Sequence, residues 1–489
     1  MMAYMGGVNY NDTLGTTAIW DAIIFRKLAN KNVVVPFQPE PPSHVPQFAG
    51  GYVKEIQEGM HEWVLSSDVN SEYPNLIVQY NMSPETFIPH VTMEVNPDQI
   101  IDSVLAGKPL FDEDPGVCVA ANGACFRKDV KGIIPTLVEE LYARRVSVKK
   151  EAGKNKKKLE TLPKDSLERK ETEKIIAKLD TEQMAIKILL NSLYGACGSK
   201  YFRYFNLRMA EAVTLSGQTA IRLAEATVNR WVSTMMEETQ PKDRVLAVDT
   251  DSVYVSLKDV VDKFKPKDPV AFLNEFYEKG IGPELANAFD RLSKTTHAYV
   301  NRMEMKREAI ADRAVWTAKK RYILNVLDNE GVRYSEPKLK IMGIEAIKSS
   351  TPAVCRAAMK RMFRIIMTGD RRATQDAIAQ FRKEFRAMSP REVAFPRGTS
   401  DVDGWQSKAT IYQKGTPIHV RGSLLYNHLI NAKGLTSTYR EIQSGDKLRY
   451  VYLKIPNEIQ ENVIAFPAAG NLPSEFGLHK SIDYDTQFE

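Results

Sequence analysis

Three aspartates occupy positions from which they could bind metal ions. Asp68 ends a run typical of a β-strand, and Asp249 and Asp251 lie at the turn of a β-rich hairpin over 244–257. Strands placed side by side would gather these carboxylates at one edge of a sheet. Two Mg²⁺ ions about 3.5–4 Å apart neutralise the attacking and leaving oxygens of phosphoryl transfer, and Mg²⁺ prefers oxygen ligands. An isolated aspartate at such a position is more often a turn former or helix cap. Whether these three bind metal therefore has to be judged from the residues around them.

Apolar periodicity predicts the elements that would position these aspartates. A strand over 62–68 runs into a turn, after which Pro74 can open a helix. Two long helices, over 131–150 and 166–194, are predicted to form an antiparallel hairpin. The lysine-rich segment 149–158 between them is predicted to be a solvated loop or a helix tip.

The rest of the chain has fewer distinctive signals. Helical patterns recur over 20–28, from 195 to about 236, and from 350 onward. A further strand pair is predicted near 321–326 and 332–334, and the proline-rich stretch 36–46 can only be a loop.

Bulk composition indicates an ordinary globular protein. The 489 residues are 43% hydrophobic and 26% charged, which suggests about three domains or one multi-lobed enzyme. The net charge of +6 permits a polyanionic partner without identifying one. The four cysteines match no zinc pattern and are predicted to be free thiols. No apolar run is long enough to span a bilayer and no signal peptide is evident, so we expect a cytoplasmic protein without a membrane partner.

Four segments resemble the motifs of family B DNA polymerases and occur in the family's order. They are Asp68-Val-Asn-Ser-Glu-Tyr-Pro-Asn-Leu-Ile77, Lys187-Ile-Leu-Leu-Asn-Ser-Leu-Tyr-Gly195, Val248-Asp-Thr-Asp-Ser252 and Lys319-Lys-Arg-Tyr322. Further segments at 336–343, 348–352 and 419–422 look like the replicative polymerases of large tailed bacteriophages. The resemblance covers nearly the whole chain, from about Trp20 to Phe488.

The resemblance implies an α+β fold with the right-hand architecture of polymerases. An antiparallel-sheet palm, two-helix fingers and a mostly helical thumb are expected. The implied division is 1–130 for an N-terminal segment and the first part of the palm, 131–197 for the fingers, 198–345 for the second part of the palm, and 346–489 for the thumb. The implied activity is template-directed, 5′–3′ DNA synthesis from dNTPs on a primer–template, that is, a nucleotidyltransferase of DNA replication.

The resemblance also assigns roles to individual residues. Asp68, Asp251 and the carbonyl of Val69 would bind two Mg²⁺ ions, which Mn²⁺ could replace, and Asp249 would support them. The triphosphate would meet the backbone N–H groups of Asn70, Ser71 and Glu72, and a cationic clamp of Arg145, Lys149, Lys187 and Asn191. Tyr73 would lie under the deoxyribose, and Tyr194 and Gly195 against the nascent base pair. Lys319, Lys320, Arg321 and Tyr322 would face the primer–template duplex.

The chain departs from the family pattern at three places. Glu72 stands where an apolar residue is usual, Ala247-Val248 replaces Tyr-Gly, and Ala318 replaces a glycine. A carboxylate beside a triphosphate is electrostatically unfavourable unless it points away or pairs. These differences bear on rate and fidelity.

The first polymerase motif lies much closer to the start of this sequence than is usual in the family. Phage enzymes of this type carry a 3′–5′ exonuclease before the first motif, which begins here at residue 68, and a sliding-clamp-binding tail after the thumb. We therefore expect one piece of a split or truncated polymerase without proofreading, with a separate exonuclease chain as a partner and no clamp assigned. The alternative is a catalytically weak subunit that binds primer–template, and an RNA-synthesising enzyme is disfavoured by Tyr73.

Overall fold

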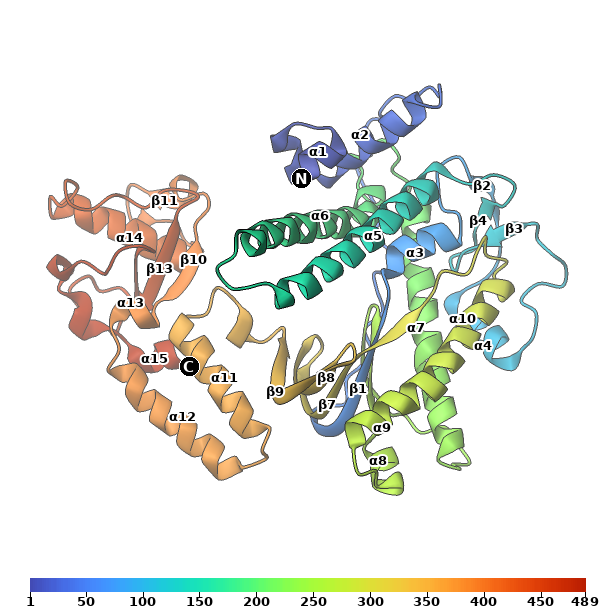
Figure 1. The fold of residues 1–489 in the computed structure, drawn as a ribbon. Coiled ribbons are helices and arrows are strands. Elements are labelled where there is room, and N and C mark those ends of the chain that lie inside the picture. Colours follow the sequence, from blue (N-terminus) through green and yellow to red (C-terminus); the bar gives the residue numbers. More distant parts are fainter. The chain divides into compact units, whose positions relative to one another are not determined.

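The computed structural model describes residues 1–489, which form two compact units. The first comprises Met1–Asp312 with Leu327–Ser335, and the second Arg313–Val326 with Glu336–Glu489. Strands and helices are mixed throughout, which confirms the expected α+β class (Figure 1). None of the helices combines the length and the apolar character needed to cross a bilayer.

A six-stranded sheet carries the predicted aspartates. Its order is β5 (Val245–Asp249), β6 (Ser252–Ser256), β1 (Gly59–Val69), β7 (Met305–Ala318), β8 (Arg321–Asn329) and β9 (Val332–Met342). The predicted hairpin over 244–257 is confirmed as β5 and β6, which pair antiparallel. Each strand contains two buried valines, a residue type that favours a buried pleated surface.

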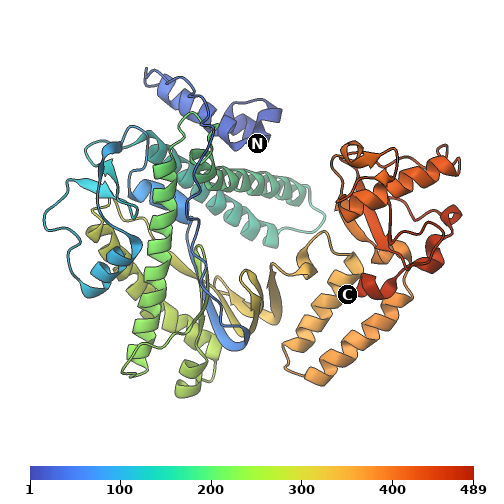
Figure 2. The ribbon, with the colours of Figure 1, turned by 180° about the vertical axis from the view of Figure 1, so that it is seen from behind.

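A long helix, α7 (Leu207–Met235), runs through the core of the first unit and packs on α3 (Glu72–Gln79), α4 (Pro97–Ala106), α10 (Gly282–Thr295) and β5. Most of its alanines and β-branched residues are buried, so neighbouring elements approach its axis closely. Figure 2 shows the extended segment that precedes β1 running beside α7. The contact is fixed where Gln218 Nε2 donates to the carbonyl of Gly50, 2.6 Å away.

The predicted helical hairpin is confirmed as α5 (Ile133–Thr161) and α6 (Leu167–Cys197), which lie side by side in Figure 1. Of the two predictions for 149–158, the helix tip is confirmed and the loop is wrong, because these residues lie in the last three turns of α5. Lysine and glutamate are good helix formers, and pairs across the hairpin support the extension: Lys156 with Asp180 at 2.9 Å and Lys158 with Glu168 at 2.7 Å.

Smaller elements complete the first unit. Helices α1 (Met2–Gly6) and α2 (Thr16–Ala29) lie on the hairpin, which confirms the helix predicted over 20–28. A three-stranded sheet pairs β2 (Phe87–Thr92), β4 (Ala124–Arg127) and β3 (Val117–Val119). Helices α8 (Lys258–Phe264) and α9 (Pro269–Phe276) lead from β6 to α10. All four cysteines are free, as predicted.

The second unit has its own core, built around a sheet that the sequence did not predict. Helices α11 (Ala353–Ile366) and α12 (Arg371–Arg386) pack together, and α13 (Pro390–Val393) follows. Strands β10 (Phe395–Gly398), β13 (Lys447–Tyr452) and β14 (Val463–Pro467) form the sheet, on which α14 (Ile418–Ala432) packs. Two short strands, β11 (Gln406–Ser407) and β12 (Ile411–Tyr412), and the terminal α15 (Tyr484–Phe488) complete it.

Candidate active site

Pairing of β1 with β6 brings the two principal aspartates together. Asp68 lies opposite Ser252 in the antiparallel register, and the backbone N–H of Val69 donates to the carbonyl of Asp251 at 2.8 Å. The Ser252 hydroxyl lies 3.0 Å from Asp68 Oδ2 and 3.4 Å from Asp251 Oδ1. Residues 183 positions apart in the chain thus share one hydroxyl, which confirms that Asp68 and Asp251 meet at one edge of the sheet.

The turn between β5 and β6 explains one departure from the family pattern. Its left-handed residue is Thr250, with φ of 59°, and Asp251 N–H donates to the carbonyl of Asp249 at 2.7 Å. Val248 lies within strand β5 and is 1% exposed. A β-branched residue is favourable in that conformation, so the turn does not need a glycine at position 248.

A fourth carboxylate, Glu308 on β7, belongs to the same cluster. Ser66 Oγ lies 3.3 Å from Glu308 Oε2 and ties the glutamate to β1. Burial raises the pKa of Asp251, and the charges of Asp249 and Glu308 raise it further. The sequence did not mark Glu308, because only the pairing of β7 beside β1 brings it near Asp251. An excess of negative charge at this edge is the condition that a bound cation relieves.

The donor set fits Mg²⁺ bound together with substrate. The cluster offers carboxylate and carbonyl oxygens, which are the ligands of hard cations. No three His, Cys, Asp or Glu side chains are close enough to enclose a metal ion by themselves. Mg²⁺ commonly retains several waters and is completed by substrate phosphates, so two aspartates and a carbonyl are an adequate protein contribution.

The α5–α6 hairpin presents cationic side chains to solvent. Lys187 and Asn191 are exposed one turn apart on α6, and Lys149 is exposed on α5. Arg145 is half-buried, and its Nε has no hydrogen-bond partner. Its neighbour Arg144 is instead paired with Glu182, with 2.6 Å between nitrogen and oxygen. Arg145, Lys149 and Lys187 form no ion pair with a carboxylate, as is also true of several other lysines of the hairpin.

The start of α3 links the aspartates to α6. Tyr73 packs against Tyr194 with ring centroids 4.7 Å apart. The N–H groups of Ser71 and Glu72 precede or open the first turn of α3, where helix amides have no intrahelical partner. The prediction for Asn70 needs correction, because its N–H donates to the carbonyl of Glu304 at 3.0 Å and its side chain to Tyr142 at 2.6 Å.

Comparison with known proteins places this geometry in a family. The model of DNA polymerase family B matches residues 15–469. The chain belongs to DNA polymerase family B. It is 31% identical to the DNA-directed DNA polymerase of Enterobacteria phage T4, over 100% of this chain and 59% of that protein. It is 32% identical to the DNA-directed DNA polymerase of Escherichia phage RB69, over 96% of this chain and 56% of that protein.

An archaeal relative matches more distantly. The DNA polymerase of Desulfurococcus sp. (strain Tok) is 26% identical, over 94% of this chain and 49% of that protein. The family B resemblance to phage enzymes, read from four motifs, is thus confirmed. The chain spans little more than half the length of its phage relatives, and the expectation of a split or truncated enzyme stays a prediction.

Glu72 is the strongest departure of this family B chain. Its side chain is 4% exposed, and Oε1 has no hydrogen-bond partner. Burial raises the pKa of Glu72 well above its ordinary value, and the charges of Asp251 and Asp68 add to the shift. Both effects favour the neutral form of the Glu72 carboxyl group, and in that form it would not repel a triphosphate.

We expect Glu72→Gln to stabilise the metal-free protein, and more so at high pH. Glu72 has a higher pKa in the folded protein than in the unfolded chain. Between these two pKa values the folded state holds a proton that the unfolded state has lost, so the free energy of unfolding decreases as the pH rises through this interval. Each pKa unit corresponds to about 1.4 kcal/mol, and glutamine avoids that loss. Thermal unfolding in EDTA at pH 5 and pH 8 would measure it, with exposed Glu160→Gln as the control. If Glu72→Gln raised the unfolding temperature equally at pH 5 and pH 8, the pKa of Glu72 would not be raised.

The Lys-Lys-Arg-Tyr motif turns the chain from β7 to β8 in the second unit. Lys319 and Lys320 are exposed, with Lys320 left-handed at φ of 62°. Arg321 holds Glu345 with two hydrogen bonds of 2.5 and 3.1 Å, which against the opposing effect of burial lower the pKa of Glu345 to about 2. Tyr322 is 5% exposed and stacks on Trp316 at 5.5 Å. The direct DNA contact predicted for Tyr322 is corrected to packing in the core.

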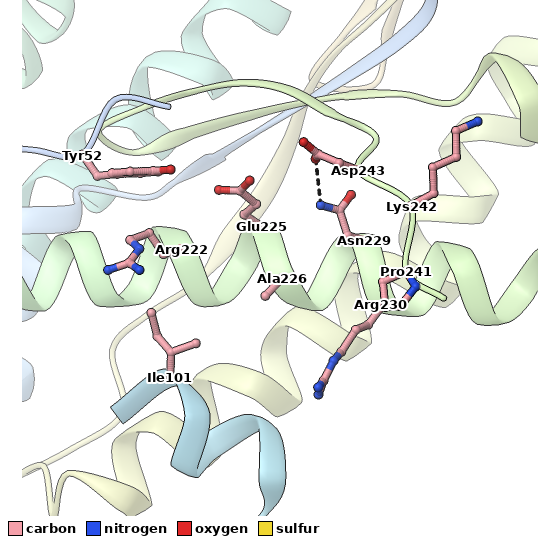
Figure 3. A pocket seen from close by; sticks show the side chains of 10 residues that line it. All are labelled: Tyr52, Ile101, Arg222, Glu225, Ala226, Asn229, Arg230, Pro241, Lys242 and Asp243. Carbon is pink, nitrogen blue, oxygen red and sulfur yellow. Dashed lines mark hydrogen bonds between the residues drawn. The ribbon is translucent and has the colours of Figure 1, made fainter. Parts of the chain in front are cut away.

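A separate hollow of about 420 Å³ lies along α7 in the first unit (Figure 3). It includes none of the predicted site residues. Its acids are compensated internally, since Lys54 Nζ lies 2.5 Å from Glu225 and 2.7 Å from Asp243, and Asn229 also bonds Asp243 at 3.0 Å. Figure 3 shows the hydrogen bond from Asn229 on α7 to Asp243, which precedes β5, and with the Lys54 ion pairs it ties α7 to the start of that strand.

Proposed function

We propose that this chain catalyses template-directed DNA synthesis, adding dNTPs to a primer 3′-hydroxyl by a two-metal mechanism. The observation that supports it best is the junction of β1 and β6, where Asp68 and Asp251 share the Ser252 hydroxyl. Membership of family B supports the reaction class. Primer–template DNA and dNTPs are the proposed ligands, and Mg²⁺ the proposed cofactor.

The chain's residues divide the proposed work. Asp68, Asp251 and the Val69 carbonyl would hold two Mg²⁺ ions, which would supply charge neutralisation for the attacking 3′-oxygen and the leaving pyrophosphate. Asp249 and Glu308 add negative charge behind Asp251 and strengthen cation binding. In the reaction the primer oxygen bonds to the α-phosphorus, the bond to the bridging oxygen breaks, and the proton of the 3′-hydroxyl passes to solvent.

Side chains of the α5–α6 hairpin and of α3 position the nucleotide. Arg145, Lys149 and Lys187 bind the β- and γ-phosphates, since charges aimed at the leaving group stabilise the transition state. Asn191 lies one turn from Lys187 on the same face of α6. Gly195 is exposed, and a Cβ built there would meet nothing within 4 Å, so this surface is open for a base pair.

The remaining contacts fix the sugar and the duplex. The ring of Tyr73, backed by Tyr194, is proposed to lie under the deoxyribose and to exclude a 2′-hydroxyl. The exposed Lys319 and Lys320 are proposed to bind duplex phosphates, which carry affinity without sequence information.

Primer extension tests the proposed function. We expect the purified chain to extend a 5′-labelled primer in the presence of Mg²⁺, incorporating only the dNTP complementary to the template base. EDTA should abolish extension, and Mn²⁺ should restore it. A chain that binds primer–template with measurable affinity yet extends it with neither metal would contradict the proposal, and would favour the primer–template-binding subunit instead.

A further inference from the structure

Gly217 lies in the middle of α7, where glycine is an unfavourable choice. After proline, glycine is the poorest residue in a helix interior, so its presence there calls for a packing reason. A Cβ built on Gly217 would lie 3.2 Å from Cδ and Oε1 of Glu72 and 3.2 Å from Cε1 of Tyr73. Because carbon atoms pack best at about 3.5–4.0 Å, a side chain at position 217 would force the Tyr73 ring or α7 to shift by a few tenths of an ångström.

A second glycine borders the other end of the same tyrosine. Gly51 lies on the extended segment before β1, and a Cβ there would be 3.1 Å from the Tyr73 hydroxyl and 2.8 Å from the side chain of Thr250. The segment cannot easily retreat, because Thr250 N–H donates to the carbonyl of Tyr52 at 2.9 Å. In contrast, a Cβ on the adjacent Gly50 would meet nothing within 4 Å.

We propose that Gly217 and Gly51 are positioning residues for sugar selection: they let α7 and the segment before β1 close on Tyr73 from two sides and so fix where its ring meets the sugar of the incoming nucleotide. Tyr194 supports the ring from α6. The inference rests on the proposed function, since it takes Tyr73 as the group that excludes a 2′-hydroxyl. Sugar choice is then set by backbone that touches neither nucleotide nor metal.

The backbone conformation at neither position requires glycine. Gly217 is helical, and the φ of Gly51 is not in the left-handed region, so alanine can adopt both conformations. At position 217 a Gly→Ala change therefore adds one methyl group beside Tyr73 without imposing backbone strain, whereas at position 51 the methyl group would also displace the Thr250 side chain. The contact at 217 is tight enough that the ring must give by a few tenths of an ångström.

The test compares kcat and KM for a dNTP and the matching rNTP on one primer–template. For Gly217→Ala we expect the ratio of the two kcat/KM values to change at least about fivefold, because sugar selectivity is a difference between two transition-state binding energies. The KM for dNTP should rise more than kcat falls. Gly153→Ala, in α5 with nothing within 4 Å of its Cβ, is the matched helix control and should leave the ratio unchanged.

Two further comparisons separate positioning from general damage. In a Tyr73→Ala background, Gly217→Ala should not change the ratio further, since groups that act through one another are non-additive. Gly51→Ala should alter the ratio while Gly50→Ala does not. A folded Gly217→Ala variant with wild-type ratio and KM, or an effect that persists in full without the Tyr73 ring, would overturn the inference while leaving the polymerase assignment intact. Wild-type protein unable to incorporate dNTPs would overturn the proposed function and the inference with it.

Discussion

Asp251→Asn is expected to lower the rate of nucleotide incorporation about a thousandfold or more, since the loss of roughly 4 kcal/mol of transition-state stabilisation has that effect. Asp251 shares Ser252 with Asp68, and its environment is crowded with Asp249 and Glu308. Asparagine keeps the shape but loses the charge that binds the cation. Single-turnover extension with saturating dNTP and Mg²⁺ would measure the loss.

Binding of primer–template separates this effect from unfolding. Fluorescence anisotropy with labelled duplex should give nearly the wild-type Kd, because the proposed duplex contacts lie elsewhere. Asp102→Asn, an exposed aspartate of α4 without an ion pair, should retain wild-type kinetics. Near-normal extension by Asp251→Asn in Mg²⁺ would show that the metal assignment is mistaken.

Tyr73→Ala is expected to raise the use of ribonucleotides relative to deoxyribonucleotides, by about tenfold to two hundredfold in the ratio of kcat/KM values, the range that a change of a few atoms in a pocket produces. The ring contacts Tyr194, and both Gly217 and Gly51 border it closely. Its removal is expected to open a space where the sugar of the incoming nucleotide is proposed to lie.

The matched control keeps the ring. Tyr73→Phe loses only the hydroxyl near Gly51, and its sugar preference should stay close to that of the wild type. Parallel assays with a dNTP and its ribonucleotide analogue decide the matter. If the ratio is the same for Ala, Phe and Tyr at this position, Tyr73 does not select the sugar.

Local sequence predicted the elements whose signals are local. Strand β1, the β5–β6 hairpin and the helices of the α5–α6 hairpin follow from apolar periodicity and from the turn at Asp249-Thr-Asp251. The extent of α5 was missed, since a lysine-rich run reads as a solvated tip until its ion pairs with α6 are known. In the second unit, runs as short as Val463–Pro467 could not be assigned from periodicity alone.

Site residues that belong to a sequence motif could be predicted. Site residues that only the fold brings together could not. Asp68 and Asp251 could be predicted to lie together because each belongs to a motif of the family. Glu308 could not, since it joins the cluster through the position of β7. The raised pKa of Glu72 likewise depends on its burial beside α7, which no spacing in the sequence reveals. Tyr322 is the converse case, in which a motif residue proved to belong to the core.

Helix α2 contacts the α5–α6 hairpin through polar side chains at two points, which couples the movement of the two. Trp20 Nε1 donates to the carbonyl of Leu189 at 3.1 Å and lies 3.2 Å from the Ser192 hydroxyl, within the stretch that carries Lys187 and Asn191. Lys27 pairs with Glu140 of α5 at 2.5 Å. A rotation of the hairpin about its base would therefore have to move α2 as well, so that α2 and the residues proposed to bind the phosphates would move together.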